Sequence, residues 1–582
     1  MKTQHPLART LVPARTWPIF IDLTVVLCAL AFFLGMIRLG TYWMARPTPG
    51  IVISRSIRAL PLYAFYSIAR MGIAYLLSLV FAVGYGYIAA YNRRVEAWML
   101  AVLDILQSIP VLSFLPGVML AMIALFPGHQ LGVELGSIVL LFTSQVWNMA
   151  FSFYSSLKSI PREMIEATRI YRYSAWQRFW QLELPFSAIG LIWNSIVSVA
   201  SGWFVLIPCE MLTFGTRNFR LPGMGSYLYN AASATPVDMH ALFWGMTVLI
   251  LIIVATDQLI WRPLIAWSDK FKFEQVEATI RVTSPILTLL RRPSVLLRLP
   301  FRAWNGVEER ILKRLSATRG CRVVEPIDDD SAKGGRLFPA LLGIFAGLTM
   351  LWAASQAVQL LQGVTWADIR LLLLGAAATY LRVAAALLIA ALWTVPVGVA
   401  IGSNPRLAQV LQPITQIAAS IPASAFFPVL MLLLINSGWG LGIGSIALML
   451  LGTQWYVLFN VIAGAMAIPS DLKEAAAVYR FTLWQRWTRL ILPGIFPYLI
   501  TGMVTASGGA WNTSILAEYG TLGDRTLQTV GLGAQISAAT YGGKSSTLLM
   551  ATVLMATIVV TMNRLVWRRL YRLAETRYKL ES

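Results

Sequence analysis

Long apolar stretches recur along this chain, each of about the length that a membrane-spanning helix needs. A helix that crosses a bilayer needs about 20 mostly apolar residues. On that rule the sequence predicts six spans before a polar central segment and six after it. They are about 17–36, 71–91, 99–126, 132–157, 186–208 and 242–262, then 337–358, 383–403, 409–435, 441–466, 494–516 and 546–566. This pattern predicts an all-α polytopic membrane protein.

Two polar, amphipathic islands interrupt the apolar pattern and share much of their sequence. They run over 160–185 and 468–493 and align without a gap. Each starts with a proline (Pro161, Pro469) and carries an acid in its first turn, which is typical of a helix N-terminus. Helical spacing puts Met164, Ala167, Thr168 and Tyr171 on one face of the first predicted helix, and Leu472, Ala475, Ala476 and Tyr479 on one face of the second. The small alanines among them would let another surface approach closely. Either these helices lie on the bilayer, or they dock a partner. Two matched copies favour a two-fold partner.

The two halves repeat each other well beyond the islands. At a spacing of 312, Arg70 pairs with Arg382, Gly86 with Gly398, and Ser108-Ile-Pro110 with Ser420-Ile-Pro422; at 308, Trp147 pairs with Trp455, Trp203 with Trp511, Glu210 with Glu518, and Gly223-Met-Gly225 with Gly531-Leu-Gly533. Because six is an even number of spans, each half begins and ends on the same side, which predicts parallel repeats with a pathway between them. The predicted domains are a first membrane domain over 1–266, a linker over 267–336 and a second membrane domain over 337–582.

Composition and charge agree with the membrane interpretation. The chain is 57% hydrophobic and 13% charged, and its mean hydropathy is +0.66. The net charge of +21 is typical of Lys and Arg in cytoplasmic loops beside anionic lipid, so no nucleic-acid partner is expected. The scattered cysteines and histidines predict neither a disulfide framework nor a metal site.

Positive residues also predict the orientation. Lys2, Arg9 and Arg15 place the N-terminus in the cytoplasm, and the same side then holds the islands, the linker and the C-terminus. Four arginines in the outer loops weigh against this topology: Arg38, Arg46, Arg55 and Arg58. The linker region, with its acidic run over 328–330, is either a regulatory domain or a connector lying on the membrane surface, and its composition favours the connector.

The islands carry a resemblance to a known family. Glu166-Ala-Thr and Glu474-Ala-Ala, each followed nineteen residues after the Glu by a proline (Pro185, Pro493), resemble the EAA loop of permease subunits in binding-protein-dependent ABC importers. The resemblance implies the type I permease fold and a cytoplasmic coupling helix in each island. The residues it implies for coupling to an ATPase are Glu166, Ala167, Tyr171, Arg172, Glu474, Ala475, Ala476, Tyr479 and Arg480. The family usually has a glycine where this chain has Arg172 and Arg480.

Further motifs resemble one branch of that family. The Trp-Gln-Arg stretches of the islands, the Trp-to-Glu spacing of the fifth spans and the Gly-x-Gly turns look most like permeases for nitrate, sulfonates, taurine or bicarbonate, in a fused and duplicated form. The resemblance implies a bacterial inner-membrane protein with no catalytic residue or bound cofactor of its own. ATP and Mg would be held by two copies of a separate ATPase, and a periplasmic or extracellular binding protein would deliver the solute. Gly543-Lys544-Ser545 ends like a phosphate-binding loop, but Ala538 stands where its first glycine should be.

Several polar and aromatic residues are candidates for lining the pathway, although packing explains the tryptophans equally well. They are Trp147, Asn148, Trp203, Glu210, Trp455, Trp511, Asn512 and Glu518. A charge at the bilayer centre costs about 2.5–3.5 kcal/mol, so the two glutamates are expected near the outer interface or beside water. Arg70 and Arg382 are expected to anchor helices at the membrane surface. Binding of an anion is the second interpretation of these two arginines.

Other transporter classes remain open at this point. An ABC permease for ferric iron or thiamine is the nearest alternative, since fused forms exist there too. A twelve-helix secondary transporter also has two parallel halves, but it would carry a Gly-x-x-x-Asp-Arg-type loop where this chain has Tyr91-Asn92-Arg93-Arg94. A membrane enzyme would need a paired His or Asp constellation, which the sequence does not offer.

Overall fold

The computed structural model describes residues 51–126, 129–214, 217–268, 362–437, 440–522 and 525–577. The predicted spans at 17–36 and 337–358, and nearly all of the predicted linker, lie outside these residues. Contacts divide the described residues into a smaller unit, 156–192 with 256–268, and a larger unit, 51–155, 193–255 and 362–577. The larger unit therefore contains parts of both sequence halves, and the division into three domains stays a prediction.

The helices and strands follow the same order in both halves. The first half has η1 (Ile57–Ala59), α2 (Leu60–Tyr91), α3 (Arg93–Ser108), α4 (Val111–Leu125), α5 (Gln130–Lys158), α6 (Arg162–Ile170), α7 (Ala175–Arg178), η2 (Phe179–Glu183), α8 (Leu184–Cys209), β1 (Met211–Phe214), β2 (Arg217–Arg220), α9 (Met224–Ala232), α10 (Met239–Thr256), η3 (Asp257–Trp261) and α11 (Arg262–Ser268). The second half has α15 (Trp366–Ser403), α16 (Pro405–Ser420), α17 (Ala423–Asn436), α18 (Leu441–Ala467), α19 (Ser470–Val478), α20 (Leu483–Arg486), η5 (Trp487–Ile491), α21 (Leu492–Ala517), β3 (Tyr519–Leu522), β4 (Arg525–Gln528), α22 (Leu532–Tyr541), α23 (Ser545–Met562), η6 (Asn563–Trp567) and α24 (Arg568–Arg577). Each element from α2 to α11 has a counterpart from α15 to α24, which confirms the tandem repeat.

Eight helical segments in the described part of the chain are long and apolar enough to cross a membrane. They are Ile57–Tyr91, Gln130–Lys158, Ala175–Cys209, Met239–Ile265, Trp366–Ser403, Leu441–Ala467, Leu483–Ala517 and Ser545–Ala574. The second span of each half begins earlier than predicted, at Leu60 in α2 and at Trp366 in α15. The predicted spans began just after Arg70 and Arg382, but both arginines bind carboxylates inside the protein, so each helix starts before its arginine and includes it.

The third predicted span of each half is wrong as a single helix. Residues 99–126 contain the end of α3 and all of α4, and 409–435 contain parts of α16 and α17. The break lies at the Ser-Ile-Pro sequences, because proline lacks an N–H and disfavours the helical conformation of the residue before it. Pro110 has φ −61° and ψ 122°, and Ile421 has φ −76° and ψ 123°, so the chain is extended at both breaks.

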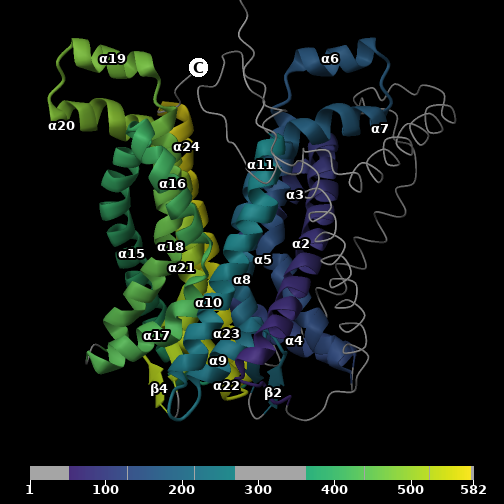
Figure 1. Cartoon of the computed structure of the whole chain (residues 1–582), viewed down its shortest axis with the longest axis vertical. Helices are drawn as coiled ribbons and strands as arrows, with labels where there is room; N and C mark the ends of the chain where they lie inside the picture. Colours follow the sequence, from purple (N-terminus) through teal and green to yellow (C-terminus); the bar gives the residue numbers. More distant parts are fainter. Residues whose placement is uncertain are drawn as a thin grey trace, which may run out of the picture. The chain divides into compact units, whose positions relative to one another are not determined.

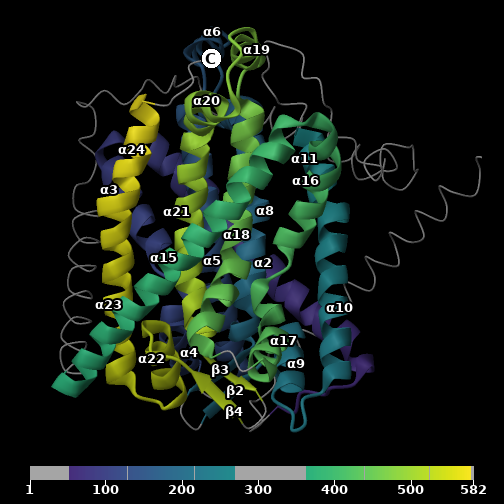
Figure 2. The same ribbon diagram turned by 90° about the vertical axis from the view of Figure 1, so that its left-hand side faces the viewer.

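The second half of the larger unit is built around α18, which packs against both α15 and α21 (Figure 2). Small residues permit this close approach: a Cβ added to Gly398 of α15 would lie 2.8 Å from a methyl of Val461. In the same unit, α19 and α20 lie at the end opposite β4 and α22 (Figure 1). The polar helix α19 is therefore separated from the hairpin by the length of the spanning helices.

The two halves exchange their short helices within the larger unit. Helix α4 packs against α21, α22 and α23, and α17 packs against α9. The Leu112 N–H donates to the Asn512 side chain at 3.1 Å, and the Ser424 hydroxyl donates to the Phe204 carbonyl at 3.2 Å. Because α9 of the first half also bonds to β3 of the second, the hairpin ends of both halves lie together. The halves therefore run in the same direction, which confirms the parallel repeat.

Candidate functional site

The two islands fold into the same local structure, α6 and α19, although these helices belong to different units. Each helix ends in a Schellman motif, in which two N–H groups beyond the helix bond back to its last free carbonyls. After α6, the Tyr173 N–H donates to Thr168 O at 2.9 Å and the Arg172 N–H donates to Arg169 O at 3.0 Å. After α19, Phe481 and Arg480 make the equivalent bonds at 3.0 Å each. The islands are thus equivalent in backbone as well as in sequence.

The residue at the C-terminal turn of each island adopts a left-handed conformation. Arg172 has φ 51° and Arg480 has φ 50°, and within the described ranges these are the two non-glycine residues with positive φ. Glycine is the usual residue at this place in a Schellman motif because it lacks a Cβ. The arginines therefore stand in the conformation that suits the family's glycine, so the replacement leaves the loop geometry intact. It costs about 1 kcal/mol of backbone strain at each site.

Replacing either arginine by glycine is expected to stabilise the protein. Arg172→Gly and Arg480→Gly would each relieve the strain, gaining about 1 kcal/mol and raising the midpoint of thermal unfolding of the purified chain by about 2–4 °C. Arg169→Gly serves as the control, because Arg169 lies inside α6, where glycine is unfavourable. A lower midpoint for Arg172→Gly than for the wild type would show that the arginine side chain contributes more than its strain costs.

The exposed surface of the islands is narrower than the sequence pattern predicted. Tyr171 and Tyr479 are 74% and 77% exposed, and Glu166, Glu474, Arg172 and Arg480 are exposed as well. Ala476, in contrast, is 5% exposed, and Ala167 and Ala475 are half-buried. The small residues are therefore partly covered by their own chain, and a glutamate, a tyrosine and an arginine remain open to a partner in each copy.

The Trp-Gln-Arg stretch of each island has a structural explanation. Gln177 accepts from the Ser174 N–H at 2.9 Å while its own N–H donates to the Ser174 hydroxyl at 3.2 Å, forming a capping box at the start of α7. Thr482 and Gln485 repeat it at α20. A π-helical segment, η2 or η5, then continues into the long helix α8 or α21. π-helical segments are rare in proteins, and those that occur are often found at functional sites.

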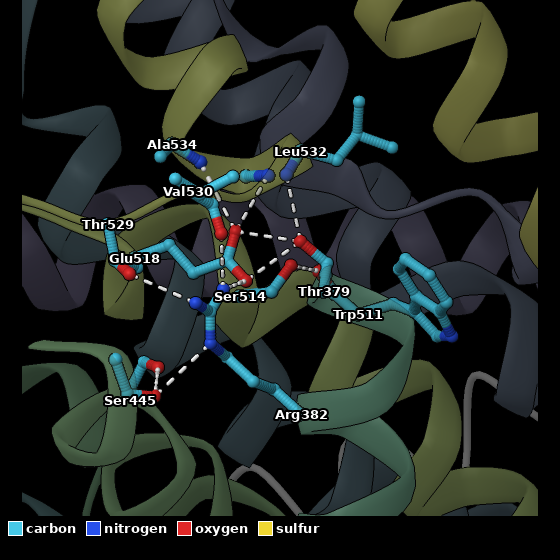
Figure 3. Close-up of polar contacts among 12 residues, drawn as sticks. Thr379, Arg382, Ser445, Trp511, Ser514, Glu518, Thr529, Val530, Leu532 and Ala534 are labelled. Carbon is cyan, nitrogen blue, oxygen red and sulfur yellow. Dashed lines mark hydrogen bonds and ion pairs between the residues drawn. The ribbon is translucent and has the colours of Figure 1, made fainter. Parts of the chain in front are cut away.

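Glu518 follows α21 and lies in a buried polar group that we name the Glu518 clasp, formed with Thr379 and Arg382 (Figure 3). Its carboxylate accepts from the Thr379 hydroxyl at 2.8 Å, from Arg382 Nη1 at 3.0 Å and from the Gly533 N–H at 3.0 Å. Arg382 also donates to Thr529 Oγ1 and to the carbonyl oxygens of Gly442 and Val530. The clasp joins α15, α21 and the start of α22.

The first half has the corresponding Glu210 clasp, formed by Ser67, Arg70, Glu134 and Glu210. Glu210 accepts from the Ser67 hydroxyl at 2.6 Å, from Arg70 Nη1 at 2.7 Å and from the Gly225 N–H at 2.7 Å. Arg70 also binds both oxygens of Glu134, at 2.6 and 2.7 Å. Arg70 is therefore fully buried, and its predicted role as an anchor at the membrane surface is wrong.

The two clasps differ in charge. Glu134 has Gly442 as its counterpart in the second half, so Arg70 meets two carboxylates where Arg382 meets one. Glu134 was not predicted as a site residue, although a glutamate inside the apolar stretch 132–157 was a usable signal. A Cβ added to Gly223 or Gly531 would overlap the carboxylate of Glu210 or Glu518, which explains the first glycine of each Gly-x-Gly turn.

The remaining pathway candidates fall into different environments. Trp455 and Asn512 line one pocket in the larger unit, together with residues of α8 and the start of α17. Trp203 and Trp511 are 3% and 1% exposed and lie in the protein interior. Trp147 packs against a core cluster around Met149, and Asn148 accepts from Gln107 at 2.8 Å. Of these candidates, the structure brings only Trp455 and Asn512 together in one pocket; the other three tryptophans pack in or against the protein core. Among the described residues, no three His, Cys, Asp or Glu side chains come together as a metal site needs.

Comparisons with known proteins identify the family. Residues 82–259 and 394–579 both match the family model of the binding-protein-dependent transport system inner membrane component. Among similar proteins, the nitrate import permease protein NrtB of Leptolyngbya laminosa is 28% identical over 190 residues, 33% of this chain and 64% of that protein. The bicarbonate transport system permease protein CmpB of Synechococcus elongatus is 27% identical over 189 residues, 32% of this chain and 65% of that protein.

A third relative, the taurine transport system permease protein TauC of Escherichia coli, is 29% identical over 164 residues, 28% of this chain and 56% of that protein. The chain thus spans less than two thirds of the length of each of these relatives. The two family matches, however, together cover more than half of the chain and fall one in each half. The chain belongs to the binding-protein-dependent transport system inner membrane component family, with the type I permease fold present in two tandem copies.

Proposed function

We propose that this chain forms, between its two halves, the membrane pathway of an ATP-driven importer of a small anion, and that α6 and α19 couple it to separate ATPase subunits. The observation that carries this proposal is the duplicated island: each copy exposes the same glutamate, tyrosine and strained arginine at the end of the same Schellman motif. Strain is retained in folded proteins mainly where a function requires the side chain. Two equivalent surfaces suit two copies of one partner.

The proposed partners follow from this arrangement. Two ATP-binding subunits would hold ATP and Mg and dock on α6 and α19, so this chain needs no cofactor of its own. The hairpin end of the larger unit, opposite α19 (Figure 1), would then face a solute-binding protein outside the cell. In this orientation both termini and the linker would lie in the cytoplasm, and the chain would lie in the inner membrane. Closing of the ATPase pair would rock one half against the other and alternate access to the pathway.

The nature of the solute is proposed from the relatives and from one pocket. The relatives are named for nitrate, bicarbonate and taurine. The pocket that contains Trp455 and Asn512 offers about 110 Å³, well below the roughly 300–1,000 Å³ of sites for larger ligands. A small solute fits this size better than thiamine does. No charged side chain lines the pocket among the described residues, whereas ferric iron would require oxygen anions.

A double charge reversal tests the coupling. The chain is purified from membranes with its candidate ATPase, and the wild type is compared with the Glu166→Arg, Glu474→Arg double variant. Both glutamates are exposed, so the substitution leaves folding intact, and we expect capture of the ATPase to fall at least about ten-fold, which corresponds to about 1.4 kcal/mol. The control is Arg525→Glu, a charge reversal on the exposed hairpin strand β4.

Two results would contradict this proposal. Equal capture by the double variant and the wild type would show that the islands do not dock the ATPase. Failure of the wild type to capture any ATPase, with solute driven by an ion gradient alone in proteoliposomes, would favour the secondary transporter.

A further inference from the structure

Three hydroxyl groups join the two halves at the hairpin end of the larger unit. The hydroxyls of Tyr229 (α9) and Thr521 (β3) lie 3.0 Å apart. Tyr541, at the end of α22, lines the same pocket as these two residues. We name Tyr229, Thr521 and Tyr541 the hydroxyl triad. Three hydroxyls carry three donor hydrogens, and the contact between Tyr229 and Thr521 uses one of them.

The triad lines a pocket of about 90 Å³. The ring of Tyr519 forms part of the same wall and stacks on Tyr541, with centroids 5.2 Å apart and planes 22° apart. The rest of the lining is largely apolar and comes from both halves, including Leu228 and Phe427. Among the described residues no charged side chain lines it. The pocket therefore combines a corner of neutral hydrogen-bond donors with an apolar body.

The matching place in the other half is built differently. The counterparts of Tyr229 and Thr521 at the repeat spacing are Ser537 and Thr213. Both line a neighbouring pocket, which shares Tyr541 with the first. Ser537 donates to the Ile515 carbonyl at 2.8 Å, and the Thr213 hydroxyl lies 2.9 Å from the Asn218 side chain. Both hydroxyls thus bond within their own halves, whereas the Tyr229 hydroxyl contacts the other half.

We propose that the hydroxyl triad and its pocket bind the oxyanion group of the transported solute near the outer mouth of the pathway. This inference rests on the proposed function, since it assumes that the hairpin end faces outward and that the solute is an anion. Oxygens of a trigonal or tetrahedral oxyanion would accept hydrogen bonds from the hydroxyl groups of the triad. Neutral donors suit a transport site, because a solute must also leave it, and a buried arginine would hold the anion more tightly.

Removal of single hydroxyls tests the site. The purified full chain in nanodiscs is dialysed against radiolabelled nitrate, bicarbonate and taurine in turn. The wild type is expected to bind at least one of them saturably. Tyr229→Phe and Tyr541→Phe keep the rings and remove one donor each, so the dissociation constant is expected to rise about ten-fold or more, because hydrogen bonds to charged groups are strong. Ser537→Ala, the counterpart of Tyr229 in the other half, is expected to change it less than about two-fold.

The proposal is overturned if the Phe variants bind as tightly as the wild type, or if the wild type binds none of the three anions. Capture of the ATPase by the same samples confirms that the variants are folded and reports the proposed function separately. Capture of the ATPase without anion binding would contradict the proposed anion site and would still support the coupling proposal. Anion binding that depends on Tyr229 and Tyr541, without capture of the ATPase, would support the proposed anion site and contradict the coupling proposal.

Discussion

Arg70→Gln is expected to prevent accumulation of folded protein. Arg382→Gln is expected to lower the stability of the protein, while folded protein still accumulates. Arg70 is 0% exposed and binds two carboxylates, Glu134 and Glu210, that are also 0% exposed. Its removal leaves both of them buried without a counter-charge. Breaking a single buried ion pair costs about 3–5 kcal/mol, and the whole stability of a domain is about 5–15 kcal/mol. Arg382, by contrast, is 13% exposed and balances one carboxylate.

The measurement is size-exclusion chromatography of detergent extracts after stepwise heating, which reports how much folded protein survives at each temperature. Glu134→Gln is the matched control. It removes the second carboxylate and leaves Arg70 paired with Glu210, as Arg382 is paired with Glu518. We expect this variant to stay within a few degrees of the wild type. Equal heat resistance of Arg70→Gln and Arg382→Gln would show that the second buried carboxylate does not make Arg70 more important for stability than Arg382.

Gly531→Ala is expected to displace Glu518 and to lower both stability and uptake. A methyl group at this position would overlap the carboxylate that receives the bonds from Thr379, Arg382 and Gly533. Overpacking of a tight interior costs about 1–3 kcal/mol, and the displaced carboxylate loses part of its hydrogen bonding as well. Because the clasp joins two spanning helices to α22, the loss would loosen the end of the pathway. Thermal unfolding and solute uptake by proteoliposomes measure the two effects.

Gly508→Ala provides the control for Gly531→Ala. Gly508 lies within α21, and a Cβ added there meets nothing within 4 Å. Alanine in a helix is more stable than glycine by about 0.5–1 kcal/mol, so this variant should unfold at the wild-type temperature or above it. Similar losses in both variants would show that the close approach to Glu518 is not what requires glycine at position 531.

The helices of the two islands were largely predictable from the sequence, because their signals are local. A proline, a first-turn acid and the amphipathic spacing predict a short helix, and they do so twice. The conformation of Arg172 and Arg480 was not predictable in the same way. Arginine has no preference for positive φ, and the two residues take it because the Schellman bonds to the preceding turn require it.

The pairing of charges in the two clasps was not predictable from the sequence. Glu210 and Glu518 were identified as costly charges, and Arg70 and Arg382 as separate ones, but their pairing joins residues 140 and 136 positions apart. Hydropathy treats each charge as a reason to end a span. Once an arginine meets a carboxylate inside the protein, the two charges compensate each other and the helix continues.

The membrane class, the duplication, the parallel order of the halves and the positions of the two island helices could be predicted from the sequence, since each depends on hydrophobic length, repeat spacing or local helix signals. Only the folded chain shows which charges pair, that the third predicted spans break at Pro110 and Pro422, and that α4 and α17 pack against the opposite half. The contact between the hydroxyls of Tyr229 and Thr521, which joins the halves, likewise appears only in the fold. These features depend on contacts between residues that are distant in the chain, and hydrophobic pattern carries no information on such contacts.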